Sequence, residues 1–170
     1  YPIHAAIGIT VSDTLLIGSQ PILVEGVSDQ IYLQQIKKYV LAEGKYKNDK
    51  EVVFIPTGGV KGMSPVVKIL LGREDNLPYV IMDSDKPGKD KIKQLHNGLY
   101  AEEKEKVIPV SEFVGEGEFE IEDLMPLDEL ARLFAKQYRR VNSEDEFDYL
   151  YDTNAPIVNQ MEAFAKDNGY

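Results

Sequence analysis

The sequence contains no cysteine among its 170 residues, and this absence excludes several kinds of chemistry. Disulfide bonds, thiolate metal sites and cysteine nucleophiles are ruled out, so a metal ion would have to be held mainly by oxygen ligands. Mg²⁺ and Mn²⁺ are the ions that suit such ligands. The two histidines, His4 and His96, stand far apart in the chain, and we do not expect either of them to be catalytic.

Long hydrophobic runs are also missing. No segment approaches the ~20 apolar residues that a membrane span requires, and the first four residues lack the charged-then-apolar layout of a signal peptide. We therefore expect a cytoplasmic protein without membrane contact. The chain is 43% hydrophobic and 28% charged, which fits one globular domain with a small appendage. Because it does not start with Met, we expect it to be a fragment of a longer protein.

Basic residues are scarce relative to acidic ones. Nineteen Lys and Arg face 29 Asp and Glu, which gives a formal net charge of −10. This charge argues against tight DNA binding by the chain alone, because phosphate contacts normally rely on Lys and Arg. Bound divalent ions would cancel part of the negative field, and a further domain could supply a basic groove. Four lysines could contact a DNA backbone, although such a set is more often a solvated helix face: Lys86, Lys89, Lys91 and Lys93.

Four short apolar runs are typical of strands that are buried on both faces. They cover residues 21–24, 52–55, 79–82 and 107–110. The first three are each followed by a turn and a helical pattern, and these helices are predicted at residues 29–42, 64–71 and 89–99. Ser28 and the pair Ser64–Pro65 are the predicted starts of the first two helices. Pro109 in the fourth run indicates a strand at a sheet edge.

Short buried strands that alternate with helices predict an α/β fold. We expect a Rossmann-like sandwich with a mainly parallel four-stranded sheet flanked by helices and joined by right-handed crossovers. Beyond residue 124 the pattern is helical only, with helices predicted at 127–139 and 156–166. The expected organisation is a lead-in segment (1–19), a catalytic domain (20–125) and a small C-terminal helical appendage (126–170).

Acidic residues follow the first predicted strand. In open parallel sheets, ligands bind beyond the carboxyl ends of the strands. Glu25 ends the first strand, and Asp29 lies four residues further, one helical turn away, so both carboxylates could face one ion. The alternative is that the two acids only favour the positive end of a helix dipole.

A second acidic pair, Asp83 and Asp85, ends the third predicted strand. Two carboxylates so close together are unfavourable unless a cation lies between them, and residues i and i+2 of an extended backbone point to the same side. A divalent ion would resolve the repulsion. The alternative is a solvated turn built with Pro87 and Gly88. An Asp-x-Asp pair also occurs in sugar transferases and phosphatases, so it indicates a metal more than a reaction.

Residues 116–123 contain five carboxylates in eight positions, just before the helical region. Such a run is usually a solvated stretch that starts a helix. Its place after the fourth strand makes Glu122 a further candidate metal ligand, with Glu120 as the second choice. Gly58 and Gly59 could let backbone amides approach a phosphate. The segment that follows them does not match the Walker pattern, so ATP binding by this chain is not supported.

In order, the segments 23–29 (LVEGVSD), 56–59 (PTGG), 80–88 (VIMDSDKPG) and 120–124 (EIEDL) resemble the Toprim domain, which is shared by topoisomerases, primases and several nucleases. Within that superfamily the chain is most similar to the OLD (overcoming lysogenisation defect) nucleases, in which an ATPase region precedes a C-terminal Toprim region. Residues 12–16 and the Glu-Asp-Leu ending favour this branch. The resemblance covers residues 12–126.

The resemblance implies a DNA endonuclease that uses Mg²⁺ (or Mn²⁺), with two ions. Glu25 matches the Toprim glutamate, and Asp83 and Asp85 match the paired aspartates; these three are the expected catalytic residues. The metal ligands implied in this way are Glu25, Asp29, Asp83, Asp85 and Glu122, with Glu120 as the second choice for the last position. The implied reaction is in-line attack of a metal-activated water on a DNA phosphodiester, without a histidine base.

Individual roles follow from the same resemblance. Glu25 would hold one ion, act as general base, and share that ion with Asp29. Asp83 would bridge the two ions, and Asp85 and Glu122 would bind the second.

The implied partners are DNA and an ATPase domain in the same full-length chain, with oligomerisation through domains outside this chain and a role in phage defence or DNA maintenance. A lysine expected in the helical region has two candidates without a motif, Lys136 and Lys166. The alternatives are a Toprim domain of topoisomerase or primase type, a receiver-like metal-binding regulatory module, and an inactive fragment that dimerises within a larger ATPase.

Overall fold

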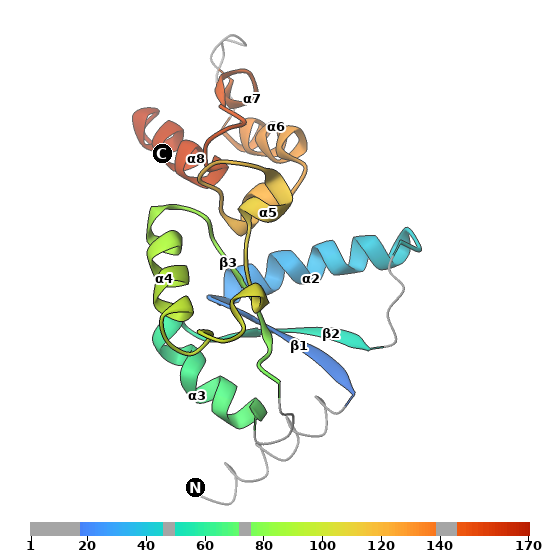
Figure 1. Cartoon of the computed structure of the whole chain (residues 1–170). Helices are drawn as coiled ribbons and strands as arrows, with labels where there is room; N and C mark the ends of the chain where they lie inside the picture. Colours follow the sequence, from blue (N-terminus) through green and yellow to red (C-terminus); the bar gives the residue numbers. More distant parts are fainter. Residues whose placement is uncertain (1–17, 46–49, 72–75, 139–145) are drawn as a thin grey trace, which may run out of the picture. The chain divides into compact units, whose positions relative to one another are not determined.

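The computed structural model describes residues 18–45, 50–71, 76–138 and 146–170. The chain has an α/β fold with a four-stranded, all-parallel sheet flanked by helices, which confirms the predicted fold class (Figure 1). The strand order is β2-β1-β3-β4. Nearly all of the predicted lead-in segment lies outside the described residues, as do His4 and the segment 12–16 of the Toprim resemblance.

The four strands closely follow the four predicted apolar runs. The strands are β1 (Ser19–Val24), β2 (Glu51–Pro56), β3 (Tyr79–Met82) and β4 (Val107–Pro109). The helices are α2 (Val27–Ala42), α3 (Val60–Leu71), α4 (Lys86–His96), α5 (Ser111–Val114), α6 (Leu127–Gln137), α7 (Phe147–Leu150) and α8 (Ile157–Asp167). Two short 3-10 helices are η1 (Lys104–Lys106) and η2 (Ile121–Leu124).

The chain divides into two compact units. Unit 1 comprises Tyr1–Ile81 and Glu103–Lys106, and unit 2 comprises Met82–Glu102 and Val107–Tyr170. The predicted limits of the catalytic domain and the helical appendage stay a prediction. Among the described helices, none combines the length and the apolar character needed to cross a membrane.

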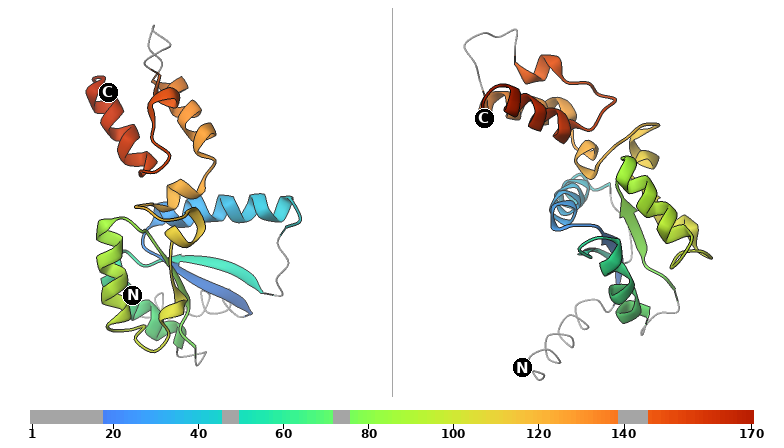
Figure 2. Two further views of the ribbon diagram at one scale, coloured as in Figure 1. Left: turned by 45° about the horizontal axis from the view of Figure 1, so that its top comes forward. Right: turned by 90° about the vertical axis from the view of Figure 1, so that its left-hand side faces the viewer.

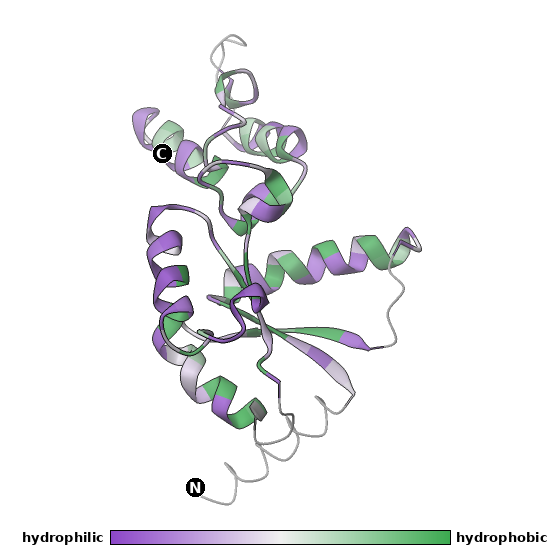
Figure 3. Cartoon of the chain, viewed as in Figure 1, coloured by the Kyte–Doolittle hydropathy of each residue, from purple (hydrophilic) through white to green (hydrophobic). Residues whose placement is uncertain are grey.

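Unit 1 is built around the parallel strands β1 and β2. They pair along their full length, from Ser19 opposite Glu51 to Val24 opposite Pro56. On its other side β1 pairs with β3, with Leu23 opposite Val80. Most of the side chains buried in this unit are apolar, and the buried polar ones are Ser19 and Asp29. The apolar ones are Leu23, Val24, Leu33, Phe54, Met63, Val67, Val80 and Ile81. Colouring by hydropathy shows that β2 is apolar beyond its first residue, as expected for a strand that packs into a core (Figure 3).

Strand β2 lies at the edge of the described sheet. The N–H of Thr57 donates to the carbonyl of Val24 at 3.0 Å, so the polar backbone groups of residues 52 and 54 point away from β1. Two side chains of α2 bind these outward carbonyls. Lys37 Nζ donates to Val52 O at 2.6 Å, and Gln30 Nε2 donates to Phe54 O at 2.9 Å. Helix α2 therefore satisfies backbone groups that an edge strand would otherwise leave to solvent.

The first three helices start earlier than predicted, whereas α6 starts at the predicted residue and α8 one residue later. Helix α2 has Gly26 as its N-cap instead of the predicted Ser28, because the carboxylate of Asp29 turns back to the Gly26 N–H. Helix α3 starts at residue 60 and contains Pro65 in its interior, so Ser64–Pro65 is not its start. Gly58 and Gly59 have φ angles of 70° and 94°, and this left-handed turn leads β2 directly into the helix.

Unit 2 contains a helical module, defined here as α6, α7 and α8. The buried core of the module consists of Ala131, Ala135, Phe147 and Ile157. Its aromatic rings pack edge to face: the centroid of Phe147 lies 4.9 Å from that of Phe134 and 5.5 Å from that of Phe164. Figure 2 shows the ribbons of α6, α7 and α8 next to one another. Helices α6 and α8 are the two helices that the sequence predicted, although the predicted end of the first at Arg139 lies outside the described residues.

Candidate functional site

The β1–α2 connection holds the first pair of candidate acids, Glu25 and Asp29. Glu25 follows the last residue of β1 and is partly buried, and its carbonyl accepts the N–H of Gly59 at 3.0 Å. Asp29 is buried, with both carboxylate oxygens engaged locally. Oδ2 accepts the N–H of Gly26 at 2.9 Å, and Oδ1 accepts the hydroxyl of Ser28 at 3.0 Å. This is the geometry of a helix-capping carboxylate, and the role of Asp29 as a metal ligand stays a prediction.

The β3–α4 connection holds the second pair around a buried serine. Ser84 is 1% exposed, and its Oγ accepts the N–H of Ser111 at 2.6 Å while its own N–H donates to Phe119 O at 2.7 Å. The flanking residues Asp83 and Asp85 are partly exposed. The backbone therefore alternates as expected for an extended strand end, with the serine facing inward and the two aspartates facing away from it.

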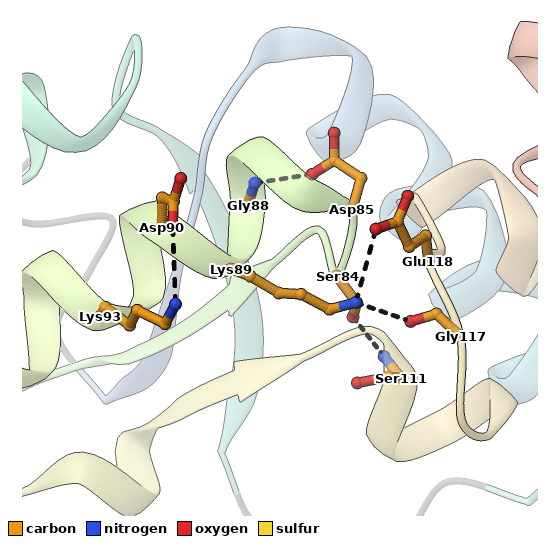
Figure 4. Close-up of polar contacts among 9 residues, drawn as sticks. All are labelled: Ser84, Asp85, Gly88, Lys89, Asp90, Lys93, Ser111, Gly117 and Glu118. Atoms are coloured by element: carbon orange, nitrogen blue, oxygen red, sulfur yellow. Dashed lines mark hydrogen bonds and ion pairs between the residues drawn. The ribbon is translucent and has the colours of Figure 1, made fainter.

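Asp85 is the N-cap of α4, which begins three residues earlier than predicted. Its Oδ1 accepts the N–H of Gly88 at 2.7 Å, and its other carboxylate oxygen points away from that contact (Figure 4). A Cβ atom on Gly88 would lie 2.2 Å from the carbonyl oxygen of Asp83 and 2.7 Å from Asp85 Oδ1. Only glycine leaves room for this turn, so the Pro-Gly pair opens a helix here and does not form a separate solvated turn.

The acidic segment 116–123 is tied to the second pair within unit 2. Oδ1 of Asp83 accepts the N–H of Ile121 at 3.0 Å. The contact joins residues 38 positions apart and brings the segment that contains Glu120 and Glu122 beside the end of β3. Of the six candidate ligands, unit 2 thus holds four, and unit 1 holds Glu25 and Asp29.

Asp123, which is 5% exposed, is not among the candidate residues predicted from the sequence. Its Oδ2 accepts the N–H of Glu120 at 2.8 Å, and its Oδ1 accepts the N–H of Ile157 at 3.0 Å. The spacing Glu120-x-x-Asp123 is that of a capping box, which was the one sequence signal that could have marked this residue. Ser84 was overlooked as well, because a serine between two aspartates looks like part of a solvated turn.

Acidic side chains crowd around Glu120. Its pKa is raised from 4.5 to about 7, first by burial and then by the negative charges of Glu122, Asp85, Asp123 and Glu162. A bound cation would remove this repulsion. The perturbed carboxyl therefore marks a part of unit 2 where negative charges lie close together.

Two lysines of α4, Lys89 and Lys93, contact nearby acids, and Lys89 also contacts a backbone carbonyl. Lys89 Nζ lies 3.8 Å from Glu118 Oε1 and donates to Gly117 O at 3.3 Å (Figure 4). Lys93 pairs with Asp90 at 3.6 Å. The two lysines and their two acidic partners are exposed, which favours the interpretation as a solvated helix face. Contact with DNA stays a prediction.

The chemistry of the candidate ligands fits Mg²⁺ or Mn²⁺, because all of them are carboxylates. Within the described residues, however, no three His, Asp or Glu side chains form a group that could hold a metal ion. The carboxylates of Asp29, Asp83 and Asp85 accept backbone N–H groups instead. The chain matches no protein-family model, no curated protein and no solved structure.

Proposed function

We propose that this chain is the Mg²⁺-dependent DNA endonuclease domain of a larger OLD-type, ATP-dependent nuclease. The main support is the position of the acids in a parallel sheet. Strands β1 and β3 are neighbours, with Leu23 opposite Val80, and each strand is followed directly by an acid, Glu25 and Asp83. Ligands of open parallel sheets bind beyond these carboxyl ends.

In the proposed domain the ions would be held by carboxylates alone. Glu25, Asp83 and Asp85 are the main ligands, and Asp29, Glu122 and Glu120 are the additional ones. When bound, such ions would lower the pKa of an attacking water and neutralise charge on the phosphodiester. They would also offset part of the chain's net charge of −10, which otherwise repels DNA.

The chain's own contacts would orient the ligands. The buried Ser84 fixes the backbone between Asp83 and Asp85 through its bonds to Ser111 and Phe119. The cap contact to Gly88 orients one oxygen of Asp85 and turns the other away from the helix (Figure 4). Preorganised carboxylates of this kind lower the entropy cost of binding an ion.

A non-catalytic module is the second candidate, and one observation favours it. Asp29, Asp83 and Asp85 each accept a backbone N–H, so each has a structural role without any metal. Such a module would bind Mg²⁺ or stabilise a larger ATPase and leave DNA uncut.

The deciding experiment incubates the purified chain with supercoiled plasmid and Mg²⁺, Mn²⁺ or a chelator. Nicking that requires the metal is expected, and gel electrophoresis separates the supercoiled and nicked forms. Metal binding measured by calorimetry without any nicking would support the non-catalytic module instead.

Two variants assign the activity to the proposed residues. Glu25→Gln and Asp83→Asn should abolish nicking and keep the fold, because an Asn side chain at 83 still offers an oxygen to the Ile121 N–H. Glu129→Gln and Asp90→Asn are matched controls, because they remove the same charge from exposed surface pairs and should retain activity. Wild-type nicking in both Glu25→Gln and Asp83→Asn would refute the assignment.

A further inference from the structure

We infer that Asp123 is a positioning residue that couples the helical module to the turn from which Glu120 and Glu122 project. The coupling itself follows from contacts within unit 2. Its effect on metal binding rests on the proposed function, in which these two glutamates are metal ligands.

The two oxygens of Asp123 serve two different segments. Oδ2 accepts the N–H of Glu120 at 2.8 Å and so closes the turn that begins η2. Oδ1 accepts the N–H of Ile157, 34 residues further along the chain, at 3.0 Å. A local helix cap needs only the first contact. The second contact is buried and has no role in closing η2.

Ile157 links this contact to the core of the helical module. It is the first residue of α8 and is fully buried together with Ala131, Ala135 and Phe147. Charge-assisted hydrogen bonds are strong and directional, so the two hydrogen bonds that a buried carboxylate accepts weaken steeply when their geometry changes. A shift of α8 would therefore be felt at Asp123 and at the Glu120 N–H.

The same turn is held from its other side by the end of β3. Oδ1 of Asp83 accepts the N–H of Ile121, the residue next to Glu120. Two carboxylates thus fix two consecutive N–H groups, one from the strand end and one from the residue that also binds α8. Helix α8 also contributes Glu162 to the negative surroundings of Glu120. The helical module is therefore connected to the acidic turn by both geometry and charge.

Asp123→Asn separates the two contacts with little change in shape. An asparagine has one acceptor oxygen and an NH₂ group that can only donate, so it can serve only one of the two N–H groups. Asp128→Asn is the matched control, because Asp128 lies in the same helical module, is exposed, and bonds the hydroxyl of Tyr151. If Asp123→Asn does not fold by circular dichroism, Asp123→Ser keeps one acceptor in a smaller side chain.

Hydrogen exchange measured by NMR tests the coupling without any assay of function. In Asp123→Asn one of the two amides, that of Glu120 or that of Ile157, loses its acceptor and should exchange about tenfold faster, corresponding to the loss of a buried hydrogen bond. If the two contacts are coupled, the amide that keeps its acceptor should exchange faster as well. Asp128→Asn should leave both rates unchanged. Faster exchange at only one of the two amides, with the other unaltered, would overturn the coupling.

Calorimetric titration with Mg²⁺ tests the positioning role. Loss of a residue that orients metal ligands costs about 10–100-fold in metal affinity, so Asp123→Asn should need that much more Mg²⁺ for half-saturation, with nicking restored at excess Mg²⁺. A purely structural role would lower the folded fraction and leave the Mg²⁺ affinity of the folded protein unchanged, which refutes positioning. Mg²⁺ binding by the wild type that shifts in the variant, without any nicking, supports positioning and refutes only the nuclease.

Discussion

The β1–α2 and β3–α4 connections look alike in sequence and differ in what their carboxylates bind. Each runs from a buried strand through an acid into a helix, and each helix start is capped by an aspartate. In the first connection the capping residue is Asp29, inside the helix, and both its oxygens accept groups at most three residues away. In the second the capping residue is Asp85, at the N-cap itself.

The acids that directly follow the strands show what this difference means. At the end of β3, Asp83 bonds Ile121, 38 residues further along the chain, and Ser84 bonds Ser111 and Phe119. The side chains of the second connection therefore hold distant segments together, whereas both carboxylate oxygens of Asp29 bind groups at most three residues away. Similar acidic motifs at two strand ends can thus have different structural roles, and only the contacts distinguish them.

The largest expected difference in the free energy of unfolding is between alanine substitutions at two glycines, Gly88 and Gly26. Gly88→Ala would place a Cβ 2.2 Å from a backbone oxygen of Asp83, so unit 2 must distort, and we expect a loss of about 3 kcal/mol in the free energy of unfolding. A Cβ atom at position 26 would make only ordinary contacts, with Ser28 Oγ at 3.4 Å and with Asp29 Oδ1 at 3.7 Å and Oδ2 at 4.0 Å, so Gly26→Ala should cost less than ~1 kcal/mol. Urea denaturation measures both. Equal losses would show that the two turns are equally tolerant.

Lys37 in unit 1 and Lys89 in unit 2 can be compared directly, because each contacts a carboxylate and a neighbouring backbone carbonyl. The Lys37 side chain is 11% exposed, whereas that of Lys89 is 48% exposed. Lys37→Met should destabilise the protein by about 1.5–2 kcal/mol, and Lys89→Met by less than ~0.5 kcal/mol, because solvent screens the exposed pair. Thermal and urea denaturation of the two variants test this order, which a greater loss in Lys89→Met would reverse.

The two capping aspartates should differ by a smaller amount. Asp29→Ala removes two hydrogen bonds from a buried carboxylate, and Asp85→Ala removes the cap contact to Gly88. We expect losses of about 1.5 and about 1 kcal/mol respectively, the usual range for helix caps. The free energies of unfolding should be compared with chelator present, so that metal binding does not contribute. An Asp29→Ala variant as stable as the wild type would contradict the capping role.

The smallest effect concerns pH and the crowded acids of unit 2. The folded-state pKa of Glu120 is about 7, above its ordinary value of 4.5, so the folded protein binds the extra proton between these values. Glu120 therefore costs stability as pH rises through 7, and Glu120→Gln should remove that cost. We expect the variant to gain stability relative to the wild type between about pH 5 and about pH 8, on the order of 1 kcal/mol after solvent screening. An equal difference at both pH values would contradict the raised pKa.

The sequence was sufficient to predict the strands, because buried strands form short apolar runs with clear ends. It was less informative about helix starts, since Asp29 and the turn at Gly58 and Gly59 set these through backbone geometry that no periodicity records. The acid Asp123 could not have been identified as a link to α8, because its partner Ile157 is 34 residues away. Acidic character selected the candidate site residues, whose role stays a prediction, and left open which of them bind backbone groups.

The side chains that cover the edge of β2 affect how copies of the protein interact at high concentration. An edge strand with unpaired backbone groups can pair with a strand of another molecule and so start fibril formation. A strand from another molecule could pair with β2 only after displacing the ammonium of Lys37 from the carbonyl of Val52 and the amide of Gln30 from the carbonyl of Phe54. Two side chains from one helix thus oppose polymerisation along this edge and favour a protein that stays dispersed.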